Sequence, residues 1–219
     1  MKQFKDVLSF RFLQAGLTDW LLKDTITEFK ALGVQEIIVL PSDLRRVKQL
    51  LAGSEIQVGC VVDFPLAQGT IAKKAFEIGR SFMDGADFLE VWLPATLLAE
   101  EEQVADLEEF METSRSLALS GGEIRWAINT AFMNELAKIQ VAQHLKAWNW
   151  PSITLGQTLS VSEALHDVSI FALDGGSQLR IQVNVAATQE DQQPLAALLQ
   201  SGAAKIGLPF TESTVLLTE

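Results

Sequence analysis

The chain of 219 residues contains no tyrosine, one cysteine and two histidines. The single cysteine, Cys60, excludes an internal disulfide and is typical of a protein from a reducing compartment. His144 and His166 fall on predicted helices without a cysteine or carboxylate at a zinc-ligand spacing. We therefore expect neither a metal site nor an organic cofactor.

Positive charge and long apolar runs are also scarce. Seventeen basic residues face 28 acidic ones, which gives a net charge of −11. The resulting field repels phosphates and argues against nucleic acid or an anionic membrane as a partner. No run approaches the ~18 apolar residues that span a bilayer, and the first 16 residues show no signal-peptide pattern. We expect a soluble cytoplasmic protein.

What is present is an alternation of short apolar, β-branched runs with longer segments of helical period. This pattern predicts repeated βα units and a parallel sheet. Eight such runs predict an α/β fold, a (β/α)₈ TIM barrel forming one domain over residues 1–219. An open, doubly wound sheet is the alternative. The predicted strands are residues 7–12, 36–40, 56–62, 88–93, 124–128, 153–155, 179–185 and 204–208.

Helix signals fall between these strands. Thr18 with Asp19 and Ser42 with Asp43 offer N-caps, and Gly33 offers a helix stop. The apolar run at residues 170–173 fits no predicted helix and is interpreted as a short extra strand or part of the seventh unit. The predicted helices are residues 19–32, 44–53, 70–83, 100–119, 133–148, 161–167 and 194–200.

Polar side chains follow or end many of the predicted strands. In a barrel, the carboxyl ends of the strands surround one mouth, and reacting groups gather there. Glu90 and Asp63 are candidates for acid and base, because burial could separate the pKa values of two such carboxyls. Each of these groups could equally be a hydrogen-bonded structural residue. The candidate substrate-binding residues are Arg11, Asn129, Thr154 and Asn184.

Residues 64–94, FPLAQGTIAKKAFEIGRSFMDGADFLEVWLP, resemble the central segment of the deoxyribose-phosphate aldolase family. They align without a gap on FPLG…T…KAFE…GADEIDMVIN. The resemblance implies a (β/α)₈ barrel, a carbon–carbon lyase activity on a small sugar phosphate and a homodimer. In that family a lysine amine forms an imine with the sugar carbonyl, and the imine accepts electrons during cleavage.

The family's reactive groups map onto different residues in this chain. When the family glycine of strand six is matched to Gly156, Ser152 falls at the imine-forming lysine, and Asn184 falls at the second lysine on strand seven. Glu90 falls at the relay aspartate, Ser9 at the strand-one aspartate and Asn129 at the strand-five glutamate. The phosphate-binding glycines correspond to residues 186–188 and 208–210, which read AAT and LPF. The resemblance therefore implies weak or absent imine chemistry.

Two functions remain open at this point. The first is a divergent aldolase-like enzyme in which Glu90 and Asp63 act as acid and base; a relocated imine lysine at Lys205 is a variant of it. The second is a non-catalytic barrel that binds a small metabolite or a protein partner. A mouth filled by Phe210 or Trp92 would favour the second, and an open polar pocket would favour the first.

The tryptophans offer one further expectation. Trp148 and Trp150 lie close together near the end of a predicted helix. We expect them to form an exposed patch for a partner subunit.

Overall fold

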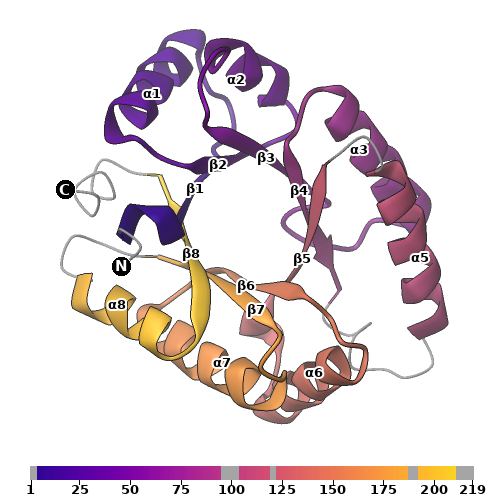
Figure 1. Cartoon of the computed structure of the whole chain (residues 1–219). Coiled ribbons are helices and arrows are strands. Elements are labelled where there is room, and N and C mark those ends of the chain that lie inside the picture. The colour runs from indigo at the N-terminus through magenta and orange to yellow at the C-terminus, as the bar shows by residue number, and fades with distance from the viewer. Residues whose placement is uncertain (1–3, 95–103, 119–121, 187–191, 211–219) are drawn as a thin grey trace.

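The computed structural model describes residues 4–94, 104–118, 122–186 and 192–210. Eight parallel strands close into a barrel in the order β1 to β8, and helices surround it (Figure 1). The barrel prediction is confirmed, and the open sheet is excluded. The strands are β1 (Leu8–Phe12), β2 (Glu36–Val39), β3 (Gln57–Val62), β4 (Phe88–Leu93), β5 (Glu123–Ile128), β6 (Ser152–Leu159), β7 (Arg180–Val185) and β8 (Ala203–Pro209).

Seven α-helices and two short 3₁₀ helices lie within the described residues. The α-helices are α1 (Asp19–Leu32), α2 (Leu44–Leu50), α3 (Ile71–Met83), α5 (Val104–Leu117), α6 (Glu135–Ala147), α7 (Val161–Asp174) and α8 (Gln192–Gln200), and the 3₁₀ helices are η1 (Phe4–Val7) and η3 (Thr130–Phe132). Among these residues no helix is long and apolar enough to cross a membrane.

Local sequence signals account for several element ends. The Thr18 hydroxyl accepts a hydrogen bond from the Leu21 amide and starts α1, and Gly33 ends it with a left-handed φ of 64°. The Thr70 hydroxyl caps α3 in the same way through the Lys73 amide. Asp43 precedes α2 but makes no side-chain capping bond.

Two elements are longer than the sequence predicts. Residues 170–173 belong to α7, so their interpretation as an extra strand is wrong; Val168 and Phe171 are buried on one face of this helix. Strand β6 runs eight residues rather than three, and Gly156 within it has φ of 71°, where the register with β7 shifts between Leu155 and Leu159. The expected start of the acidic helix at residues 100–103 lies outside the described residues.

Buried side chains lie on both sides of the strands. Phe10, Phe12, Phe29 and Phe210 pack together where β1 and the end of β8 meet α1, with Phe29 and Phe210 ring centroids 4.4 Å apart. A separate buried cluster of Ile38, Val61 and Phe88 comes from alternate positions of three neighbouring strands.

The expectation that Trp148 and Trp150 form an exposed patch is wrong, because neither side chain is exposed. Trp150 is only 5% exposed and packs against Trp126, with ring centroids 6.0 Å apart. Trp148 is half-buried and stacks on His144. A homodimer remains a prediction.

Candidate functional site at the barrel mouth

An ion pair between Arg11 of β1 and Glu90 of β4 lies inside the barrel. Each terminal nitrogen of Arg11 donates to one oxygen of Glu90, and both distances are 2.7 Å. Arg11 is 5% exposed and Glu90 is fully buried. This paired, two-point geometry is the strongest form of the arginine–carboxylate interaction.

Trp92 and Asn184 complete the surroundings of this pair. The Trp92 indole N–H donates to Glu90 Oε1 at 2.9 Å, and Arg11 donates to Asn184 Oδ1 at 3.4 Å. The Asn184 amide nitrogen donates to the Gly156 carbonyl at 2.8 Å, which ties β7 to β6. Glu90 thus accepts three hydrogen bonds from Arg11 and Trp92, and the structure brings the predicted Arg11, Glu90 and Asn184 together.

A glycine on β8 makes room for this network. A Cβ at Gly207 would lie 2.0 Å from Asn184 Oδ1 and 3.2 Å from Arg11 Cδ. Ser9, which is opposite Gly207 in the β1–β8 register, is fully buried, and its hydroxyl has no partner among the described residues.

Asp63 is held by a different cation. It follows β3 with a φ of 55°, and its carboxylate accepts from the Gly69 amide at 2.7 Å and from the Lys74 amine. Lys74 also donates to the carbonyls of Ala67 at 3.0 Å and Trp92 at 3.1 Å. Asp63 and Glu90 are therefore paired with different cations. Trp92 connects the two pairs, because its carbonyl accepts from Lys74 and its indole N–H donates to Glu90.

Lys74 does not pair with Glu77 on the surface of α3, although its place as the fourth residue of the helix would suggest this pairing. Lys74 is only 3% exposed, and Glu77 accepts instead from the Asp63 amide at 3.0 Å. Burial lowers the pKa of Lys74, although Asp63 opposes the shift. Sequence periodicity missed this burial, because it depends on the loop after β3 folding over the amine.

Asn129 lies on the rim, apart from the ion pair. It follows β5, and its side-chain oxygen accepts from the Ala131 amide at 3.3 Å. Asn129 and Gln157 line a cavity of about 380 Å³ together with Leu66, Leu93 and Phe132. The described residues that line this cavity include neither Arg11 nor Glu90.

Ser152 and Thr154 lie toward the opposite end of the barrel. Ser152 is the first residue of β6 and pairs with Arg180, the first residue of β7. Both Ser152 and Thr154 line a cavity of about 240 Å³ with Arg180 and Lys205. The Ser152 hydroxyl is therefore at the amino ends of the strands, away from the mouth.

The same end holds a buried charge cluster that sequence analysis missed. Glu36, which opens β2 and is 3% exposed, accepts from Arg125 at 2.9 and 3.1 Å and also from Lys205. Burial raises the pKa of Glu36, but Arg125 and Lys205 more than offset it, and the net pKa is lowered. A glutamate at the start of the apolar run EIIV is the one sequence signal for this cluster.

The end of β8 offers few backbone donors for an anion. Pro209 has no N–H, and the Phe210 N–H donates to the Arg11 carbonyl at 3.0 Å. The Phe210 ring lies in the aromatic cluster beside α1, so it does not fill the mouth, whereas Trp92 is fully buried beside Glu90. Residues 187 and 188 of the expected phosphate loop lie outside the described residues.

Together, the closed parallel barrel and its sequence place the chain among proteins of aldolase-like fold. It is 24% identical over 221 residues to a deoxyribose-phosphate aldolase of Bacteroides thetaiotaomicron, covering 100% of this chain and 90% of that protein. It is 22% identical over 205 residues to the deoxyribose-phosphate aldolase of Lactiplantibacillus plantarum, covering 92% and 93%. No family model matches the chain.

Solved structures show the same fold. The aldolase QR15 superposes with a TM-score of 0.83 at 15% identity, covering 100% of this chain and 95% of that one. The deoxyribose phosphate aldolase of Aeropyrum pernix gives 0.75 at 14% identity, covering 98% and 88%. The chain is thus a distant homologue of the deoxyribose-phosphate aldolases along its whole length.

Proposed function

We propose that this protein is an aldolase-like barrel that has lost lysine-imine chemistry. It acts by binding a small metabolite or a protein partner rather than by carbon–carbon cleavage. The buried Arg11–Glu90 pair, covered by Trp92 and Asn184, carries the proposal. These side chains occupy the interior of the barrel and use each other's hydrogen-bonding groups. A substrate would have to break this network to reach either charge.

Within the part of the chain that the structure describes, no strand carries a lysine whose amine lies at the barrel centre. Lys205 is the one lysine in the eight described strands, and its amine contacts Glu36 at the amino end. Asn184, at the position that the resemblance gives to the second lysine, carries an amide. Ser152, at the position given to the first, carries a hydroxyl and lies at the amino end.

The two predicted acid–base groups, Glu90 and Asp63, are also already hydrogen-bonded to other residues. Glu90 accepts three hydrogen bonds, and Asp63 accepts from Lys74 and Gly69. The charge of Arg11, the residue expected to bind an anionic substrate group, is matched by Glu90. A sugar phosphate therefore finds neither a free base nor an unmatched cation at this pair.

Lys74 is the alternative candidate for the amine of an imine-forming aldolase. Its lowered pKa favours the nucleophilic form. However, three acceptors hold this amine below the loop after β3, and Asp63 would keep only its longer ion pair with Lys73, at 3.6 Å, if Lys74 turned toward a substrate.

Borohydride trapping with 2-deoxyribose 5-phosphate, read by intact mass, tests the proposal. We expect no adduct under conditions in which a competent class I aldolase labels fully. An adduct would overturn the proposal, and peptide mapping would then distinguish Lys74 from Lys205.

A thermal-shift titration with the same sugar phosphate tests the binding argument separately. We expect no rise in Tm, because Arg11 is already paired. A rise in Tm without an adduct would contradict the argument from the paired cation and leave the loss of imine chemistry standing.

A further inference from the structure

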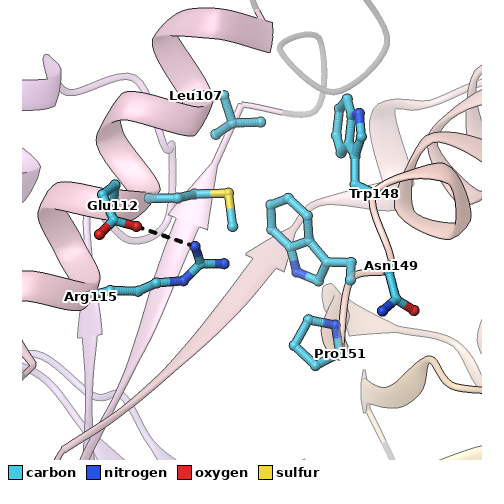
Figure 2. Close-up of a pocket in the computed structure, with 8 residues that line it drawn as sticks. Leu107, Glu112, Arg115, Trp148, Asn149 and Pro151 are labelled. Carbon is cyan, nitrogen blue, oxygen red and sulfur yellow. Dashed lines mark ion pairs between the residues drawn. The ribbon is translucent and has the colours of Figure 1, made fainter.

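A further cavity lies outside the barrel, between α5 and the segment that joins α6 to β6 (Figure 2). Its volume is about 400 Å³, within the range of small-molecule sites. Leu107 and Met111 of α5 line one side, and Trp148 and Trp150 line the other. The cavity therefore has mainly apolar and aromatic walls.

Trp150 lines this cavity and carries a buried hydrogen-bond donor that is unpaired within the described part of the chain. The residue is 5% exposed, and its indole nitrogen has no partner among the described residues. A buried indole N–H ordinarily finds an acceptor, and leaving it unpaired costs free energy. Trp148 and Trp150 have ring centroids 6.0 Å apart at 39°, so their rings are tilted rather than stacked.

Arg115 places a positive charge at the same cavity. Its one ion pair in the described structure is with Glu112 at 3.6 Å, drawn as a dashed line in Figure 2. The two side chains are 61% and 75% exposed, and such exposed pairs contribute little. Arg115 also lines a neighbouring cavity of about 290 Å³ with Trp126 and Pro151. The guanidinium is thus free to exchange Glu112 for another anion.

We propose that this cavity between α5 and residues 148–151 is a binding site for a small, flat, apolar molecule that carries one anionic group. The flat body packs against Trp148 and Trp150, and the anionic group pairs with Arg115. The site lies outside the barrel, and the proposal does not depend on the function proposed for the mouth.

Two fluorescent probes that differ by one charge test this assignment. The first is 8-anilinonaphthalene-1-sulfonate, and the second is N-phenyl-1-naphthylamine, which has the same aromatic body without the sulfonate. We expect Arg115→Gln to weaken binding of the sulfonate about tenfold, because a charge-assisted contact is lost. The neutral probe should bind the variant and the parent equally.

Arg45→Gln is the matched control, because Arg45 on α2 is also an ion-paired arginine, 60% exposed. It should leave both probes unchanged. Unchanged near-ultraviolet circular dichroism and a single cooperative thermal transition would show that the probes report on folded protein. Equal sulfonate affinity in Arg115→Gln and the parent would overturn the proposal.

The indole N–H of Trp150 gives an independent readout. In ¹⁵N-labelled protein, we expect the sulfonate to shift the Trp150 indole signal, assigned by through-space contacts to Trp126, and to leave that of Trp20 unchanged. Trp20 is a suitable reference because it is 72% exposed and on α1. A shift at Trp20 with none at Trp150 would place the probe elsewhere and overturn the assignment.

Discussion

Glu90 combines complete burial with a full set of charged and polar donors, so its substitution should be costly. Replacing Glu90 by glutamine leaves Arg11 buried without a counter-charge. We expect a loss of about 3 kcal/mol in the free energy of unfolding, measured by urea titration. The control is Glu112→Gln at the exposed Arg115 pair, which should change stability by less than about 0.5 kcal/mol. A loss of stability in Glu90→Gln no larger than that of the control would contradict the interpretation that the Arg11–Glu90 network occupies the barrel interior.

Cys60 is the second residue whose environment determines its chemistry. Burial within β3 raises the pKa of its thiol to about 12, and the thiolate is the reactive form. We expect native protein near neutral pH to react with a chromogenic disulfide reagent far more slowly than unfolded protein. The release of thiolate, followed by absorbance with and without denaturant, provides the measurement. Equal rates would mean that the strand opens readily to solvent.

At the scale of elements, two glycines should respond oppositely to the same substitution. Gly207→Ala in β8 would drive a methyl group into Asn184 and Arg11, and we expect a loss of about 2 kcal/mol. Gly79→Ala in α3 meets only the Leu117 side chain at 3.7 Å, and we expect a gain of about 0.5–1 kcal/mol from helix propensity. Urea unfolding of both variants tests the pair. An unchanged free energy of unfolding in Gly207→Ala would show that Arg11 and Asn184 rearrange easily to accept the added methyl group.

Local signals explain how much of the elements could be predicted. Thr18, Gly33 and Thr70 mark helix ends through contacts with residues a few positions away, so sequence alone identifies them. The position of Ser152 could not be obtained in this way. It depends on how far β6 extends on either side of Gly156, where the pairing with β7 shifts.

The burial of Lys74 and the charges around Glu36 escaped prediction for the same physical reason. Their partners come from distant segments, and only closure of the barrel brings them together. Sequence analysis placed Arg11, Glu90 and Asn184 in one group at the mouth, because strand ends share one face of a barrel. That predicted group also contained Asp63, Asn129 and Thr154, which lie in other surroundings. Sequence analysis did not predict that Arg11 and Glu90 would bind each other instead of leaving a pocket.

For the whole molecule, the Glu36 cluster predicts a pH dependence. Its folded-state pKa lies below the ordinary value of 4.5. Its contribution is therefore present above about pH 4.5 and is lost as pH falls through the folded pKa. We expect the unfolding free energy to decline on acidification more steeply in the parent than in Glu36→Gln, which should already be less stable at neutral pH. Parallel declines in urea titrations across pH would contradict this role.

The same cluster links the order of chain synthesis to barrel closure. Glu36 emerges early, whereas its partners lie 89 and 169 residues later on β5 and β8. A nascent chain that ends before Ala203 has two unpaired strand edges, on β1 and β7. In such a chain the Glu36 carboxylate also lacks one of its two cations, Lys205. Closure of the ring and neutralisation of Glu36 are therefore completed together, when the final strand joins.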